Sequence, residues 1–76
     1  MNINIRTFTG RIYRINMNIT DTVRDLKFVI QQKHGIPREK FTLITSGKHL
    51  LNDDFLSRYN LSENPTLNLV YRLYGG

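Results

Sequence analysis

Hydrophobic and polar residues alternate one by one in the N-terminal quarter of the chain. Ile3 and Ile5 share one phase, and Ile15 and Met17 share one phase further along, with asparagine and arginine between them. A period of two predicts two half-buried strands, because successive strand side chains point to opposite faces of a sheet. Gly10, between the two runs, can supply the positive φ of a tight hairpin.

The apolar period changes to three and four residues after Thr22, which predicts a helix over residues 23–34. Thr22 and Asp25 have the spacing of a capping box, in which each side chain accepts a hydrogen bond from the other residue's backbone N–H. Gly35 is placed to end the helix in a left-handed conformation, and Pro37 blocks its continuation.

Three further strands are predicted over residues 41–44, 48–51 and 66–72, with one short helical turn over residues 56–59. An antiparallel hairpin followed by a helix that covers one face predicts an α+β roll, in which one main helix packs across a mixed sheet. The expected core consists of the inward-phased apolar residues of these elements: Ile3, Ile5, Ile15, Met17, Val23, Leu26, Ile30, Leu43, Leu50, Leu56, Leu61, Leu67 and Leu69.

Two apolar residues remain on the outer phase of the predicted sheet. If Leu43 and Leu69 point to the helix, Ile44 and Val70 point away from it. They form one patch if their strands are neighbours, and Phe8 at the hairpin tip is a candidate third member. Such a patch has two interpretations: a contact surface for a partner, or cross-strand packing that only steadies the sheet.

Composition narrows the classes of function. The 76 residues suffice for one compact domain, and the absence of cysteine excludes a disulfide scaffold, a thiolate zinc site and a cysteine nucleophile. No apolar run approaches the roughly 20 residues of a membrane span, and no signal-peptide pattern is present. We therefore expect a soluble monomer of the cytoplasm and nucleus that does not bind membranes.

The residue types needed for catalysis or metal binding are not arranged in any recognisable motif. His34 and His49 have no carboxylate or cysteine partner at ligand spacing, and no pattern pairs a nucleophile with a base. We expect no metal, no cofactor and no enzymatic activity in this chain. The net charge of +5 fits either a solvated basic surface or a surface for acidic partners or nucleic acid. The aromatic-basic motif of RNA-binding strands is missing, so nucleic acid is the least favoured partner.

The sequence ends in Leu73-Tyr74-Gly75-Gly76. Two glycines at the end of a chain have no capping, turn or packing use, but they are narrow enough for the backbone to enter a tight tunnel. The terminal carboxylate is then an unhindered acyl group, which an external ATP-dependent enzyme must activate because the chain has no phosphate-binding loop. The alternative is that the sequence is cut after Gly-Gly by chance.

With these features in view, the sequence resembles the ubiquitin family and aligns with it over all 76 residues without a gap. The resemblance implies the β-grasp roll of that family, with a domain over residues 1–72 and a flexible tail over residues 73–76. Fewer than half of the residues are identical to those of ubiquitin. The matching stretches include Thr7, Thr9-Gly10, Asp21-Thr22, Lys27, Ile30-Gln31, Lys33, Gly35-Ile36-Pro37, Leu43-Ile44, Gly47-Lys48, Leu50, Leu56-Ser57, Tyr59-Asn60, Thr66-Leu67, Leu69-Val70, Arg72-Leu73 and Gly75-Gly76.

The resemblance also implies a function and the residues that carry it. Gly76 matches the glycine that is adenylated, passed to enzyme cysteines as a thioester and joined to a target lysine, as in a protein modifier. The tail read by activating and deconjugating enzymes corresponds to Arg72, Leu73, Tyr74 and Gly75. The patch read by receptors corresponds to Phe8, Ile44, Gly47, Asn68 and Val70. Candidate acceptors for chain linkage are Lys48, Lys27 and Lys33.

The partners implied are activating, conjugating and ligating enzymes, deconjugating proteases, ubiquitin-binding receptors and target proteins. The alternative is a non-conjugated ubiquitin-like domain at the N-terminus of a longer protein. Such a domain would bind proteasome subunits or ubiquitin receptors through Phe8, Ile44 and Val70.

Several positions depart from ubiquitin. Thr42 and Tyr74 stand where ubiquitin has arginines, and the loss of both cations predicts selective, weak or lost activation by the ordinary ubiquitin enzyme. Tyr71 replaces a leucine and extends a second apolar area with Ile36 and Leu73. Four ubiquitin lysines are absent, so the corresponding linkages cannot form; the residues in their place are Arg6, Arg11, Val29 and Glu63.

Overall fold

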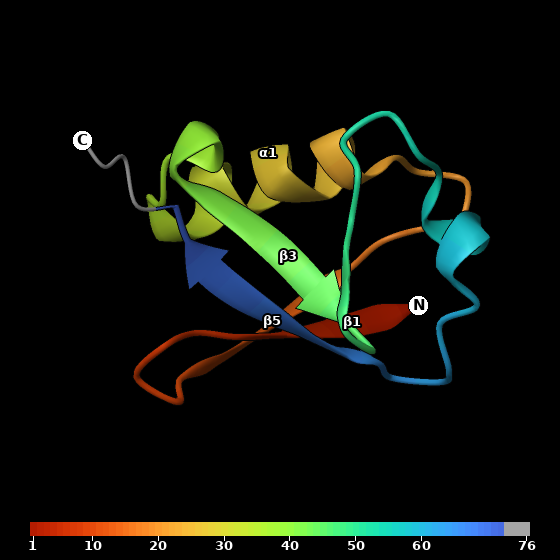
Figure 1. Ribbon diagram of the computed structural model, residues 1–76, viewed down its shortest axis with the longest axis horizontal. Coiled ribbons are helices and arrows are strands. Elements are labelled where there is room, and N and C mark those ends of the chain that lie inside the picture. The colour runs from red at the N-terminus through yellow and green to blue at the C-terminus, as the bar shows by residue number, and fades with distance from the viewer. Residues whose placement is uncertain (73–76) are drawn as a thin grey trace.

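The computed structural model describes residues 1–72 as one five-stranded sheet with a single main helix lying across one of its faces (Figure 1). The strand order is β2-β1-β5-β3-β4, with β1 and β5 parallel and the other pairs antiparallel. This mixed sheet confirms the predicted α+β, β-grasp roll. No helix within residues 1–72 is long and apolar enough to cross a membrane. The elements are β1 (Asn2–Arg6), β2 (Ile12–Asn16), α1 (Val23–His34), η1 (Arg38–Lys40), β3 (Phe41–Thr45), β4 (Lys48–His49), η2 (Leu56–Tyr59) and β5 (Thr66–Tyr71).

The N-terminal hairpin has the register that its period-two pattern predicts. Ile3 pairs with Ile15 and Ile5 pairs with Tyr13, so one phase of both strands faces α1. Gly10 adopts a φ of +86°, the left-handed conformation in which a side chain would be strained. The turn that it allows carries Phe8 at the hairpin tip.

Helix α1 begins and ends where its local signals predict. The Thr22 hydroxyl accepts a hydrogen bond from the Asp25 N–H at 3.1 Å, and the Asp25 carboxylate accepts one from the Thr22 N–H at 3.0 Å. The backbone N–H of Thr22, followed by its hydroxyl, lowers the pKa of Asp25 because both favour the charged carboxylate. Gly35 closes the other end at a φ of +72°, with its N–H donating to the Gln31 carbonyl.

Thr22→Ala should lower the free energy of unfolding by about 1 kcal/mol, because the N–H of Asp25 loses its acceptor at the helix start. Urea denaturation of the variant and the parent protein measures the difference. Thr20→Ala is the matched control, since the same atoms are removed two residues earlier from an exposed turn. Equal losses in the two variants would show that the cap contributes nothing to stability.

The core lies between α1 and the inner face of the sheet. It differs from the expected set at two residues: one is gained and one is lost. Phe41 is fully buried at the start of β3 although it was not expected in the core, because it shares the inward phase of Leu43. Leu61 was expected in the core but is only partly buried against it, since it lies in the loop after η2. The remaining expected members are buried.

Strand ends and short turns also differ from the prediction. Strand β4 ends at His49 rather than at residue 51, because the Leu51 N–H donates to the Tyr59 hydroxyl instead of a neighbouring strand. Strand β5 ends at Tyr71, one residue early. The short helix η1 was not predicted, and its turn is closed by a hydrogen bond from the Lys40 N–H to the Pro37 carbonyl at 3.0 Å.

Candidate functional site

Ile44 and Val70 lie on the outer face of the sheet, opposite the face that α1 covers. Their strands are neighbours: in the β3–β5 ladder Ile44 pairs with Asn68 and Thr42 pairs with Val70. Ile44 and Val70 are therefore diagonal cross-strand neighbours, a placement that brings side chains about 7–8 Å apart on one face. Val70 is 43% exposed and Ile44 is partly exposed, while Leu43 and Leu69 point into the core. The pair forms a small apolar area open to solvent.

Polar and cationic residues border this apolar pair. Asn68 lies between Ile44 on β3 and Arg6 on β1, so these three side chains form one row across the sheet. His49 pairs with Ile44 on the other side, and Gly47 turns the chain there at a φ of +75°. An apolar centre with a polar rim is the usual anatomy of a protein–protein contact.

Phe8 is the most exposed large apolar side chain of the described residues, at 90%. It lies at the tip of the hairpin, and it lines a shallow pocket of about 270 Å³ together with Ile36 and Tyr71. The structure thus joins Phe8 to two residues of the second apolar area. The third expected member of that area, Leu73, lies outside the described residues.

The described part of the chain ends at Arg72, beside η1. The Arg72 N–H donates to the Lys40 carbonyl at 2.9 Å, so the end of β5 is tied to the turn that precedes β3. The Arg72 side chain is exposed. The remaining residues assigned to tail recognition and conjugation, Leu73, Tyr74, Gly75 and Gly76, lie outside the described residues.

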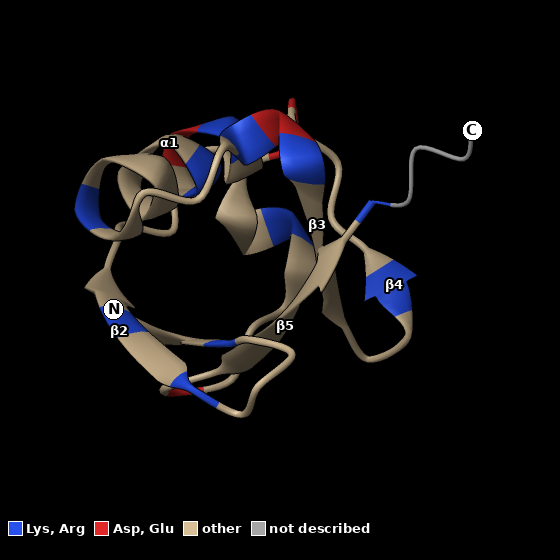
Figure 2. Cartoon of the chain, turned by 90° about the vertical axis from the view of Figure 1, so that its left-hand side faces the viewer, with Lys and Arg blue, Asp and Glu red and all other residues tan. Residues whose placement is uncertain are grey.

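The charges are unevenly distributed over the elements (Figure 2). The five strands carry Arg6, Arg14 and Lys48 and no aspartate or glutamate. The carboxylates lie in α1, η1 and the loops. A partner that approaches the outer face of the sheet therefore meets no carboxylate from these strands, and it meets Arg6 in the same row as Asn68 and Ile44.

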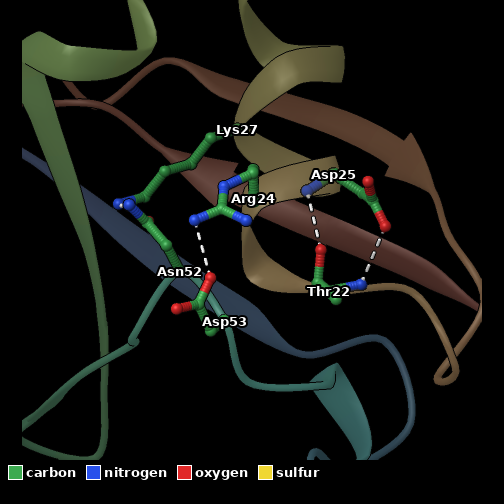
Figure 3. Close-up of polar contacts among 6 residues, drawn as sticks. All are labelled: Thr22, Arg24, Asp25, Lys27, Asn52 and Asp53. Carbon is green, nitrogen blue, oxygen red and sulfur yellow. Dashed lines mark hydrogen bonds and ion pairs between the residues drawn. The ribbon is translucent and has the colours of Figure 1, made fainter.

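The three candidate linkage lysines have different environments. Lys48 and Lys33 are exposed, whereas Lys27 is only 3% exposed. The Lys27 ammonium donates to the Asn52 side-chain oxygen at 2.6 Å, and Figure 3 shows these two side chains meeting beside the Arg24–Asp53 pair. Burial, followed by the nearby Arg72, lowers the pKa of Lys27. A linkage through Lys27 requires this nitrogen to leave its buried position.

The sequence did not indicate that Lys27 and Asn52 meet, because the two residues lie 25 positions apart and both are types usually found at the surface. In the sequence, only the helical period indicated that Lys27 is buried. Lys27 lies four residues after Val23 and next to Leu26, and both of these face the core. His34 stacks on Tyr13 with ring centroids 3.6 Å apart, and His49 lies exposed on β4. Within residues 1–72 no three histidine or carboxylate side chains are grouped to hold a metal ion.

Comparisons with known proteins agree with this geometry. The family model described as "Ubiquitin family" matches residues 3–74. The chain is 36% identical to the NEDD8-like protein RUB3 of Arabidopsis thaliana, over all of this chain and 97% of that protein. It is 34% identical to the ubiquitin-like protein NEDD8 of Dictyostelium discoideum, over all of this chain and 99% of that protein. It is also 36% identical to a segment of mouse AN1-type zinc finger protein 4, covering all of this chain but 10% of that protein.

Proposed function

The chain belongs to the ubiquitin family, and from that membership we propose that it is a protein modifier joined through Gly76 to lysines of target proteins. The relatives named NEDD8-like, matched over nearly their whole length, support a modifier. The observation that carries the receptor-binding part is the apolar Ile44–Val70 pair, bordered by polar residues and Arg6, on the uncovered face of the sheet. We expect the protein to act in the cytoplasm and nucleus without being an enzyme itself.

The proposed chemistry takes place on enzymes that act on the tail. The Gly76 carboxylate attacks the α-phosphate of ATP, pyrophosphate leaves, and an acyl adenylate forms. A cysteine thiolate of the activating enzyme then displaces AMP to give a thioester, and a target lysine amine displaces the thiol to give an isopeptide. This chain contributes an acyl group without a β-carbon and, in Arg72, an exposed cation at the start of the tail.

Charging by an activating enzyme tests the conjugation proposal. Incubation with ATP and an activating enzyme should give an adduct that a reducing thiol removes, and deletion of Gly75-Gly76 should abolish it. Two activating enzymes are compared, that for ubiquitin and that for NEDD8-like modifiers, because the sequence lacks the arginines of ubiquitin at Thr42 and Tyr74. Thr42→Arg combined with Tyr74→Arg should increase charging by the ubiquitin enzyme. The proposal fails if neither enzyme charges the chain while ubiquitin and a NEDD8-like relative are charged beside it.

The mouse zinc finger protein favours a second candidate function, because it carries a segment similar to this chain within a much longer protein. In that case the chain is a non-conjugated domain that binds proteasome subunits or ubiquitin receptors through Phe8, Ile44 and Val70. A reading frame that continues far beyond Gly76, with no cleavage there in cells, would establish this alternative. A short extension removed by a protease would instead support the modifier.

A further inference from the structure

A pocket lined mainly by cations lies between α1, η1, the loop after β4 and the end of β5. It has a volume of about 240 Å³, against the roughly 30 Å³ that one water occupies in the liquid. Its lining contains four cationic side chains and one carboxylate: Arg24, Lys27, Arg38 and Arg72 with Glu39, completed by Asn52. The space therefore suits a small anion with some of its hydration water.

Lys27 is the unusual member of this lining because its charge is buried. An ammonium has three donors, and the structure gives Nζ one acceptor, the neutral amide oxygen of Asn52 at 2.6 Å. Two carboxylates of the adjacent loop pair with other cations: Asp53 with Arg24 at 2.6 Å, and Asp54 with Arg58 at 3.6 Å. A buried charge ordinarily has an ionic partner, since burying it alone is costly.

The lowered pKa of Lys27 agrees with this geometry. Burial and the positive charge of Arg72 both disfavour the ammonium, and an anion in the pocket would act in the opposite direction. Asp53 does not act as that anion, because its carboxylate pairs with Arg24 at 2.6 Å in a largely exposed salt bridge.

The elements around the pocket are held together by backbone hydrogen bonds. The Arg24 N–H donates to the Asn52 carbonyl at 3.0 Å, which fixes the loop after β4 against α1. The Arg38 N–H donates to the Gln31 side chain at 2.9 Å, and the Arg72 N–H donates to the Lys40 carbonyl at 2.9 Å. The cationic side chains thus come from separate elements whose backbones are held in place, and the Arg38 guanidinium lies over the Phe28 ring, 5.8 Å from its centroid.

We propose that this pocket binds a phosphate-type oxyanion, with the buried Lys27 ammonium and the exposed Arg38 and Arg72 guanidiniums as its ligands. A phosphate group carries about −1.5 to −2 charges at neutral pH and three strong acceptor oxygens, so it can accept from donors that converge from three elements. A carboxylate has two oxygens and one charge, and it satisfies fewer of these donors. The ligand is either free phosphate or a phosphorylated side chain of a partner protein.

The test is a titration of the full chain with inorganic phosphate at constant ionic strength, followed by ¹H–¹⁵N NMR, with chloride as the reference anion. We expect saturable shifts at the amides of Lys27, Asn52 and Arg72. Asn52→Asp should weaken binding by at least about tenfold, because its carboxylate takes the place of the anion beside Lys27. Asn16→Asp is the matched control, with the same charge change on the far side of the sheet, and should bind like the parent chain.

Arg38→Gln provides a second variant that leaves the buried residues untouched, and it should also weaken binding. A phosphoserine peptide and its unphosphorylated form separate the two sources of the anion. Tighter binding of the phosphopeptide than of inorganic phosphate identifies a partner protein, and equal or weaker binding identifies the free ion. Shifts that do not saturate, or equal affinity in the parent chain and Asn52→Asp, overturn the proposal. Neither result depends on whether Gly76 is charged by an activating enzyme.

Discussion

Leu43→Ala should lower the free energy of unfolding by about 3–5 kcal/mol, whereas Ile44→Ala, one residue later, should lower it by only about 1 kcal/mol. Leu43 is fully buried between the sheet and α1, so its truncation leaves a cavity in the core. Ile44 points to solvent from the same strand, and its truncation removes mainly cross-strand contact with its neighbours on the outer face. For a domain with a total stability of about 5–15 kcal/mol, the first change is severe and the second is tolerated.

Receptor binding, unlike stability, should depend on the exposed Ile44. Ile44→Ala should weaken binding to an isolated ubiquitin-receptor domain by at least about tenfold, since a few residues at the centre of an interface carry most of its energy. Ile12→Ala is the matched control. Ile12 is 52% exposed on the same face of the sheet, and its strand β2 is three strands away from β3. Urea denaturation measures stability and calorimetric titration measures binding. A loss of stability in Ile44→Ala as large as in Leu43→Ala would contradict the outward position of Ile44.

Tyr59→Phe should lower the free energy of unfolding by about 1–3 kcal/mol although it removes a single oxygen atom. The Tyr59 hydroxyl donates to the Asp54 carboxylate at 2.5 Å and accepts from the Leu51 N–H at 2.8 Å. This oxygen therefore holds together η2 and the loop after β4. Phenylalanine would leave the N–H of Leu51 and the half-buried carboxylate of Asp54 without this partner.

The difference in the free energy of unfolding between the parent chain and Tyr59→Phe should also depend on pH, which provides a second measurement. Burial, followed by the hydrogen bond to Asp54, raises the pKa of Tyr59 above its ordinary value. A raised pKa means that the folded state holds the phenol proton more tightly than the unfolded state does. The stability difference between the parent chain and Tyr59→Phe is then constant below about pH 10 and shrinks above it. Tyr13→Phe is the control, and a difference that grows above pH 10 would contradict the assignment.

The sequence predicted α1 to the residue because its boundary signals are local. Thr22 and Asp25 satisfy each other across one turn, and Gly35 ends the helix regardless of what packs against it. Most of the core was also predictable, since period-two alternation needs only the strand itself. The short helix η1 has too few residues to generate a period, and the early end of β4 depends on the distant Tyr59 hydroxyl.

The candidate site was predictable only in part. The outward phase of Ile44 and Val70 follows from alternation, but their proximity requires β3 and β5 to be neighbours, which is a property of the whole sheet. The burial of Lys27 was not predictable, because a lysine is usually exposed and its partner Asn52 comes from another segment. The pair forms because the loop after β4 lies against α1 (Figure 3).

The position of β5 has a consequence for how the protein is made. It is the last strand within residues 1–72, yet it is the middle strand of the sheet, between β1 and β3. While the chain emerges from a ribosome, the β1–β2 hairpin and the β3–β4 hairpin have no edge in common, and α1 has only half a surface to cover. The sheet can close only after residue 71 has left the exit tunnel. Folding is therefore delayed until synthesis of the domain is complete, and a nascent chain stalled before that point exposes the edges of two unfinished half-sheets to chaperones and proteases.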